Sequence, residues 1–501
     1  MEDATYLANP RFETHVNVNP ERASRFPRLS QAVIDFLGLH GESAEQVVQL
    51  PATIPPVFDD SLPLTDYFVS TSHNTYLLGN QLWGKASPSS YSHVILNGAR
   101  CVEIDVWPKH TSDGDTSPIV THGWTLAEHI YFKDVCITIG DAFGKKGDDL
   151  PLFVSLECHV PTEGQQELVD IMKEAWGDKL ALHFNDQFSQ SGSIASVKDL
   201  RGKIVMMIEY YPPANPDNVA DNLEDLNVKE EEEEVENEPR PKISEALETL
   251  GYYAHSMKPK KNWLTEDLTN PANIMINISE SALSALIPTQ LDAIVENARK
   301  HLRRVYPRGS RVRSGNMNPA TFWRAGSHFT ALNWQKFDLG MQLNEAMFCG
   351  TGGWVAKPDR LLGTLGDPER VKITVDVRGL SALPRPKKDE EYRLQARVHI
   401  LYCGGEKELK SKTVKFDSKE IPEEGLDLMF DERFVAEIAD DGFTFVRVLV
   451  TDDNYLKDKH LGIFCGHLQR IQQGWRFLRL LNDDGADTHA TLLVRFGVTK
   501  T

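Results

Sequence analysis

The sequence predicts an α/β protein, in which a TIM-type (β/α)8 barrel is split by an acidic linker and followed by an antiparallel β-sandwich. Over 62–209 and 243–360, short apolar runs alternate with helix-length segments, and after Pro368 apolar and polar residues alternate at period two. Continuous apolar runs are typical of strands buried on both faces of a parallel sheet. An eight-stranded barrel takes about 250 residues, and the two regions together supply about that number.

The chain divides by composition into five expected regions. Residues 221–238 hold ten acidic residues and one lysine, too much charge and too little apolar surface for a core. An amphipathic stretch near Leu29–Leu39 indicates one or two helices. We therefore expect an N-terminal helical region, a first barrel half, an acidic disordered linker, a second barrel half and a sandwich, at 1–60, 61–210, 211–242, 243–362 and 368–498.

Strands are predicted at the apolar runs. In the barrel these are Tyr67–Ser70, Cys101–Val106, Ile119–Thr121, Leu152–Leu156, Lys203–Ile208, Asn273–Ile278, Phe329–Trp334 and Trp354–Ala356. In the sandwich they are Val371–Val377, Leu394–Leu401, Glu432–Ile438, Phe443–Thr451 and Ala490–Phe496.

Composition restricts the class of partner and the compartment. The formal net charge of −19, from 54 basic and 73 acidic residues, argues against nucleic acid as a partner. The six cysteines form no C-x-x-C pair, as expected in a reducing compartment. We find neither a secretory leader nor an apolar run of the roughly 18 residues that a membrane span needs. We therefore expect a cytoplasmic protein that associates with membranes only peripherally.

Polar side chains stand at the ends of predicted strands, where a parallel barrel carries its reacting groups. His73 and Asn74 follow the first strand, and His122 follows Ile119–Thr121. Glu103 and Asp105 are two residues apart, so both carboxylates face the same side of an extended strand.

Glu157 adds a third carboxylate from the next strand. Asparagine and carboxylate oxygens favour Ca²⁺ or Mg²⁺ over zinc, and the two histidines suit proton transfer in a phosphoryl reaction. A lone residue of any of these kinds is more often structural, but their joint position favours a functional site.

Long motifs resemble the phosphoinositide-specific phospholipase C family of eukaryotes. S-H-N-T-Y-L-L-G-N-Q-L, C-V-E-I-D-V-W, V-T-H-G-W-T-L and V-S-L-E-C-H are similar to its X box. A-R-K-H-L-R-R-V-Y-P-R-G, N-P-A-T-F-W-R-A-G and G-T-G-G-W-V-A-K-P are similar to its Y box. The resemblance covers roughly 62–498 and makes the sandwich a C2 domain. It implies a short form without a pleckstrin-homology domain.

The resemblance also implies an activity and residue roles. The expected enzyme is a Ca²⁺-dependent hydrolase that releases diacylglycerol and inositol phosphate from phosphoinositide lipids in an anionic membrane, through a cyclic phosphate. Its regulatory protein partner is left open. The implied calcium ligands are Asn74, Glu103, Asp105 and Glu157, the catalytic histidines His73 and His122, the head-group contacts Arg304 and Tyr306, and the membrane-inserting rim Leu82, Trp83, Trp124 and Leu126.

Several positions depart from the family pattern. Met207 and Glu209 stand where relatives that favour the bisphosphate carry lysines, and Asn277 replaces a serine that contacts the head group. In the sandwich, Asp452 lies in a segment that resembles the family's calcium-binding loop. The loop expected opposite it, L-P-R-P-K-K-D-E-E-Y, is basic and offers few acids, which favours a calcium-independent C2 domain. Residues 299–313, with seven Lys or Arg and no acid, are a candidate patch for anionic lipid.

Two other functions stay open from the sequence. One is a glycerophosphodiester phosphodiesterase on the same barrel, because such enzymes use a similar set of histidines and carboxylates. The other is a catalytically weak or inactive phospholipase-C-like scaffold that binds inositol lipids, which the residues at positions 207 and 209 would suit.

Overall fold

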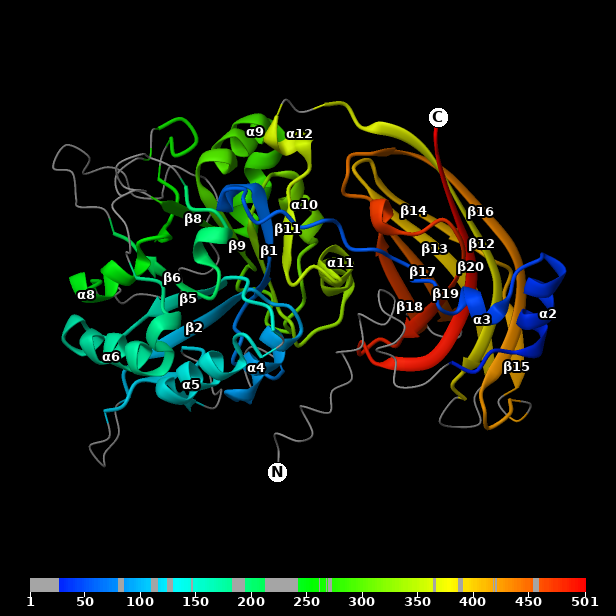
Figure 1. The fold of residues 1–501 in the computed structure, drawn as a ribbon, viewed down its shortest axis with the longest axis horizontal. Coiled ribbons are helices and arrows are strands. Elements are labelled where there is room, and N and C mark those ends of the chain that lie inside the picture. The colour runs from blue at the N-terminus through cyan, green and yellow to red at the C-terminus, as the bar shows by residue number, and fades with distance from the viewer. Residues whose placement is uncertain are drawn as a thin grey trace. The chain divides into compact units, whose positions relative to one another are not determined.

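Figure 1 shows the computed structural model, in which contacts divide the chain into two compact units. Among the described residues, one unit comprises Phe58–Lys336 and Thr351–Leu365, and the other comprises 27–57, Phe337–Gly350 and Gly366–Thr501. The structure describes residues 27–79, 85–109, 116–123, 129–145, 147–182, 194–211, 242–260, 262–266, 268, 273–363, 366–385, 391–417, 419, 421–453 and 459–501.

The first unit is a closed barrel of eight parallel strands, as predicted. Each strand pairs with the next around the ring, and β1 closes it by pairing with both β10 and β2. In ring order the strands are β1 (Tyr67–Ser72), β2 (Cys101–Trp107), β5 (Leu152–Cys158), β6 (Ile204–Glu209), β7 (His255–Met257), β8 (Ile274–Ser279), β9 (Leu302–Tyr306) and β10 (Phe329–Leu332).

Helices connect these strands in the alternation that the sequence indicates. They are α4 (Ser89–Leu96), α5 (Phe132–Ala142), α6 (Gln165–Trp176), α8 (Glu245–Glu248), α9 (Glu280–Lys300) and α10 (Pro319–Arg324), while α12 (Asp359–Leu362) follows the last ring strand in the chain. Side-chain alternation along the strands then decides what fills the barrel. Cys101, Phe153, Val205 and Met207 belong to one buried core cluster. Residues two or four positions further along each strand face the same side and reach the carboxyl-end mouth.

Two predicted barrel strands have a different role. Ile119–Thr121 is not a parallel strand: β3 (Ile119–Val120) runs antiparallel to β2 and forms a hairpin with β4 (Ile130–Tyr131). Trp354–Ala356 is β11, which lies antiparallel beside β1 outside the ring. The two remaining strands of the ring, β7 and β9, were not predicted from the sequence. β7 has only three residues, and β9 carries two arginines within an otherwise apolar run.

The second unit contains an antiparallel β-sandwich, as predicted. Its strands are β12 (Glu369–Leu383), β13 (Glu391–Tyr402), β14 (Gly405–Lys410), β15 (Val414–Asp417), β16 (Leu426–Asp440), β17 (Phe445–Asp452), β18 (Lys459–His467), β19 (Gly474–Leu481) and β20 (Asp487–Lys500). β14, β15, β18 and β19 were not predicted. Apolar residues from β12, β13, β16, β17 and β20 meet in one core cluster, which holds the layers together.

The N-terminal helices belong to this second unit. Ser30 caps α2 (Gln31–Leu39), and Ser43 caps α3 (Ala44–Val47), each through its hydroxyl. A small core joins the two helices to the sandwich; it consists of Val33, Leu37, Ala44, Val47, Trp475, Phe477 and Leu493. The same unit includes α11 (Leu339–Phe348), which contacts β18.

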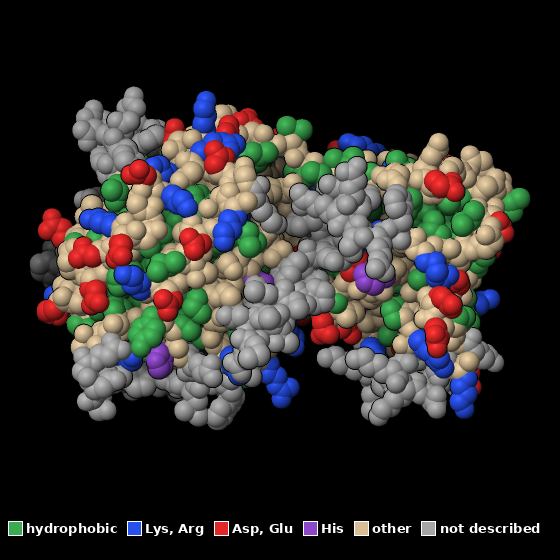
Figure 2. All heavy atoms as spheres, turned by 60° about the horizontal axis from the view of Figure 1, so that its bottom comes forward, with side chains coloured by type: hydrophobic (Ala, Val, Ile, Leu, Met, Phe, Trp, Pro, Cys, Tyr) green, Lys and Arg blue, Asp and Glu red, His purple; other side chains and the backbone are tan. Residues whose placement is uncertain are grey.

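The basic segment 299–313 is not one surface patch, contrary to the prediction. Arg303 and Arg304 are buried in β9. Arg311 forms an ion pair with Glu280, which Arg308 also approaches at 3.5 Å. On the face that Figure 2 draws, Lys and Arg side chains are interspersed with Asp and Glu. The prediction failed because charge counted along a sequence ignores the side to which a strand directs each residue.

Candidate active site

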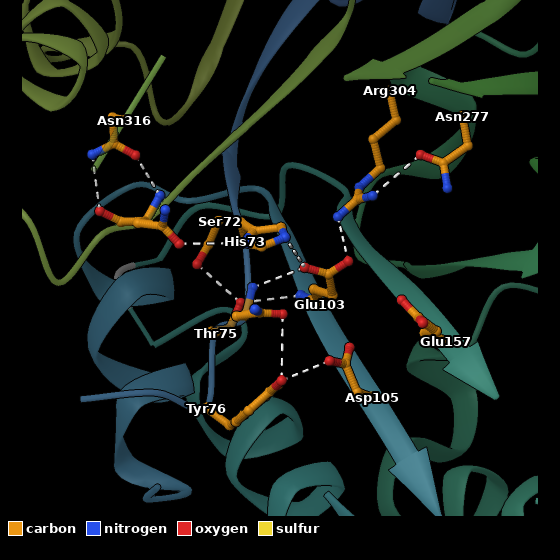
Figure 3. Close-up of polar contacts among 12 residues, drawn as sticks. Ser72, His73, Thr75, Tyr76, Glu103, Asp105, Glu157, Asn277, Arg304 and Asn316 are labelled. Carbon is orange, nitrogen blue, oxygen red and sulfur yellow. Dashed lines mark hydrogen bonds and ion pairs between the residues drawn. The ribbon is translucent and has the colours of Figure 1, made fainter. Parts of the chain in front are cut away.

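Three carboxylates converge at the carboxyl end of the barrel (Figure 3). Glu103 and Asp105 come from β2, and Glu157 comes from the adjacent β5, in register with Asp105. One oxygen from each lies within 4.8 Å of the others. The side chain of Glu157 is 32% exposed, whereas Glu103 and Asp105 are buried. The alternation of side chains along β2 therefore brings the first two carboxylates together, and the parallel register of β2 and β5 adds the third.

The turn after β1 fixes the two carboxylates of β2. Asn74 has φ = 44°, a left-handed conformation that asparagine tolerates better than most residues, and its N–H donates to Glu103 Oε2 at 2.8 Å. The Tyr76 hydroxyl donates to Asp105 Oδ2 at 2.6 Å and lies 3.3 Å from Asn74 Oδ1. The N–H of Glu103 donates to Thr75 Oγ1 at 3.0 Å. One short turn thus orients both acids.

His73 stands at the edge of the carboxylate cluster. Its Nδ1 lies 3.2 Å from Asn333 Oδ1, and its Nε2 lies 3.8 Å from Glu103 Oε2. An amide oxygen only accepts hydrogen bonds, so Nδ1 carries a proton and Nε2 faces the site. Asn333 is itself held by Asn316, which accepts from its N–H at 2.7 Å and donates to its carbonyl at 3.1 Å. The imidazole is therefore held in one orientation.

His122 arrives from the β3 segment rather than from a barrel strand, which corrects the prediction. The N–H of Thr121 donates to Asp105 O at 3.3 Å and ties this segment to β2. Burial lowers the pKa of His122, and the neighbouring His73 lowers it further, while Glu157 and Glu103 act in the opposite direction. His122 therefore shares the electrostatic environment of His73 and the carboxylates.

Burial also shifts the pKa values of His73 and Asp105. The pKa of His73 is lowered by burial, which Glu103 partly opposes. The pKa of Asp105 is raised well above its ordinary value, first by burial and then by the charges of Glu157 and Glu103. When no cation is bound, the mutual repulsion of these three carboxylates therefore favours a proton on Asp105.

Arg304 lies among these carboxylates. It is 2% exposed, forms an ion pair with Glu103 and donates to Asn277 Oδ1 at 3.2 Å. Its guanidinium carbon lies 6.0 Å from the Tyr306 ring centroid. The side chain expected to contact the head group is therefore bound to a candidate metal ligand, as Figure 3 shows.

The end of β6 supplies no cation. Met207 is 1% exposed within the barrel core, with its sulfur 3.9 Å from Cys101 Sγ. Glu209 ends the strand at the mouth. The expected membrane rim, which comprises Leu82, Trp83, Trp124 and Leu126, lies outside the described residues.

Several side chains that support the site were not predicted from the sequence. Thr75 and Tyr76 lie within the motif S-H-N-T-Y, but no role was predicted for them. Asn333 follows β10 directly, so the strand-end rule that found the acids would have found it too. Asn316 had no such signal, because it lies in a loop.

The donor set fits a divalent metal ion. Asp105 Oδ1 is buried and accepts no hydrogen bond within the part of the chain that the structure describes, an arrangement that a cation would satisfy. Carboxylate and amide oxygens are the ligands of hard cations such as Ca²⁺. Glu103, Asp105 and Glu157 would hold the metal, and the side-chain oxygen of Asn74 is a fourth candidate.

Comparison with known proteins identifies the family. The chain matches the X domain of phosphatidylinositol-specific phospholipase C over residues 61–209 and the Y domain over residues 247–360. The chain belongs to the phosphatidylinositol-specific phospholipase C family. The X-domain match contains all six predicted catalytic and metal-binding residues, and the Y-domain match contains Arg304.

Curated phospholipase C relatives extend the similarity over most of the chain. The 1-phosphatidylinositol 4,5-bisphosphate phosphodiesterase delta-4 of Xenopus laevis is 29% identical over 87% of this chain and 60% of its own length. The delta-3-A enzyme of Danio rerio is 28% identical over 88% of this chain and 58% of its own length. The chain thus spans about three-fifths of these relatives.

A solved phospholipase C structure has the same fold. The crystal structure of S. officinalis PLC21 superposes with a TM-score of 0.75 and 22% identity, over 98% of this chain and 62% of that one. The superposition includes both the barrel and the antiparallel sheet. The split barrel followed by a sandwich is therefore a phospholipase C architecture, as the sequence predicted.

Proposed function

We propose that this chain is a calcium-dependent phosphoinositide phospholipase C. It hydrolyses phosphoinositide lipids of an anionic membrane to diacylglycerol and inositol phosphate, through a cyclic inositol phosphate. The observation that carries the proposal is the convergence of Glu103, Asp105 and Glu157 beside His73 and His122 at the barrel mouth, within the region that matches the X domain. The names of the curated relatives support the same substrate class.

The residues divide the chemistry among them. Glu103 accepts the proton of the inositol 2-hydroxyl as that oxygen attacks phosphorus. The negatively charged phosphate favours the protonated form of His73, so that its Nε2 donates to a phosphoryl oxygen, and His122 protonates the departing diacylglycerol oxygen. Calcium, when bound, neutralises negative charge on the phosphate and lowers the pKa of the attacking hydroxyl. Water then opens the cyclic phosphate.

Membrane association is peripheral in this proposal. Among the described residues, no helix is both long and apolar enough to cross a bilayer. The substrate is reached at the barrel mouth. Leu82 and Trp83 follow β1 in the sequence, and Trp124 and Leu126 follow β3. Apolar and aromatic residues favour shallow insertion into a lipid surface when they are exposed to it.

Product analysis on vesicles tests the function. Vesicles containing phosphatidylinositol or its mono- or bisphosphate are incubated with the protein in calcium or EGTA, and water-soluble inositol phosphates are measured. We expect release in calcium, none in EGTA, and a roughly 10²–10⁴-fold loss in His122→Ala. The control is His129→Ala, because His129 is exposed on the same segment.

Two results would overturn the proposal. If the parent protein releases no inositol phosphate but still binds the vesicles, the chain is an inactive scaffold. If it cleaves water-soluble glycerophosphodiesters in preference to lipid, it is a glycerophosphodiester phosphodiesterase.

A further inference from the structure

The indole of Trp107 links two parts of the site that lie far apart in the sequence. Trp107 is the last residue of β2, two positions after Asp105. Its ring stacks on the imidazole of His159, with ring centroids 3.7 Å apart and planes 7° apart. His159 Nε2 in turn lies 3.2 Å from Glu157 Oε1. A continuous chain of contacts therefore runs from the end of β2 to a carboxylate of β5.

The other side of this chain of contacts reaches the loop of His122. A Cβ added to Gly123 would lie within 3.0 Å of three carbons of the Trp107 indole. Gly123 is not among the described glycines that have a positive φ, so its backbone conformation is one that other amino acids also adopt. The indole therefore occupies the space that a side chain at position 123 would need.

The backbone explains why the stack forms. β2 and β5 are parallel, with Val106 opposite Cys158, and the N–H of His159 donates to Val106 O at 2.9 Å. Trp107 and His159 therefore leave neighbouring strands at the same level. The His159 side chain is 10% exposed, so the histidine side of its contact with Glu157 is shielded from water. This contact restricts the rotamers of that glutamate.

We propose that Trp107 and His159 are positioning residues, which orient Glu157 toward the other two carboxylates and hold the His122 loop against β2. Because Glu157 is a calcium ligand only under the function proposed above, this role rests on that function. His159 acts on calcium affinity through Glu157. Trp107 acts on both calcium affinity and the placement of His122, because its ring contacts both His159 and Gly123.

Calcium titration separates this role from a structural one. His159→Leu fills the space but removes the donor, and we expect calcium affinity, measured by calorimetry, to fall about tenfold. His159→Gln keeps an N–H donor and should recover most of that loss. The melting temperatures of both variants in EGTA should match each other. The control is His399→Leu, which removes a comparable 3.1 Å contact between a histidine and Glu406 and should leave calcium affinity unchanged.

Turnover at saturating calcium separates Trp107 from His159. Excess calcium should restore the turnover of His159→Leu but not that of Trp107→Leu, whose His122 loop has lost its support. Gly123→Ala should also lower turnover at saturating calcium. The double variant Gly123→Ala/Trp107→Phe should exceed Gly123→Ala, because the smaller ring leaves room for the added methyl group.

Parental calcium affinity in His159→Leu would overturn the role of His159. Full turnover of Trp107→Leu at saturating calcium would overturn the link to His122. A parent protein that binds calcium but cleaves no phosphoinositide would instead overturn the proposed function, and the difference in calcium affinity between His159→Leu and His159→Gln would still support the positioning role.

Discussion

The ion pair between Arg304 and Glu103 predicts competition between an arginine and calcium for one carboxylate. Both side chains are buried, at 3% and 5% exposure. Arg304→Met leaves the Glu103 carboxylate in place, with the N–H of Asn74 as a remaining donor at 2.8 Å. Removing one partner of a buried ion pair costs about 3–5 kcal/mol. At roughly 2 °C per kcal/mol for a large unit, the melting temperature in EGTA should fall by about 6–10 °C.

Calcium should reverse most of this loss. A bound divalent cation neutralises Glu103 whether or not Arg304 is present, so the variant should melt close to the parent in saturating calcium. Calcium therefore stabilises the variant more than it stabilises the parent. By linkage, this difference in stabilisation equals the difference between their calcium-binding free energies. Recovery of half of the cost, about 2 kcal/mol, corresponds to roughly 30-fold tighter calcium binding by Arg304→Met than by the parent, and this is the smallest increase that we expect.

Arg303→Met provides the matched control. Arg303 is the neighbouring residue on β9 and is also buried, but its guanidinium donates to Ala325 O at 3.1 Å and to Ile294 O at 2.7 Å. Its loss should lower the melting temperature equally in calcium and in EGTA. The assay is thermal unfolding of all three proteins with and without calcium, followed by calorimetric titration. If Arg304→Met shows the same loss in both conditions and parental calcium affinity, the proposed competition is wrong.

Three further predictions concern protonation, head-group preference and the acidic tract. Because the pKa of Asp105 is raised, the calcium-free native state holds a proton that the unfolded chain loses, so its stability falls as pH rises above the ordinary aspartate range. Calcium must displace that proton, so at pH values below the raised pKa the calcium affinity should increase by up to about tenfold for each unit that the pH rises. Calorimetry in buffers of different ionisation enthalpy measures the proton release, which Asp105→Asn should abolish. Glu209→Lys should raise the rate on the bisphosphate relative to phosphatidylinositol by about tenfold, because it adds a charge-assisted contact at the mouth; an unchanged ratio would show that this strand does not contact the ring phosphates. Replacing 221–238 with a neutral Gly/Ser linker of equal length should speed hydrolysis on anionic vesicles at low salt, with a smaller gain at high salt, whereas equal rates at both would indicate only a spacer.

The sequence by itself determined the features that depend on local periodicity. Glu103 and Asp105 could be assigned to one side of a strand because side chains alternate at period two. Glu157 could be assigned to the same level because parallel strands end at the same edge of a barrel. His73 and Asn74 followed from the same rule, and the acidic composition of 221–238 marked the break between the barrel halves.

Tertiary structure decided the features that depend on which strands become neighbours. Arg304 pairs with Glu103 across 201 residues of sequence, and nothing local to either residue indicates the other. The barrel must close before β9 and β2 direct side chains to the same mouth. That closure turned a basic segment expected at the surface into a buried strand.

The origin of His122 and the contacts of Trp107 show the same limit. Two-residue β3 pairs antiparallel with β2, and so short a run has no periodicity that distinguishes it from a barrel strand. The stack of Trp107 on His159 exists because the register of β2 and β5 brings the two strand ends to one level. Local patterns thus select the candidate residues, but interstrand register decides which of them touch, because register is set by the packing of the whole barrel.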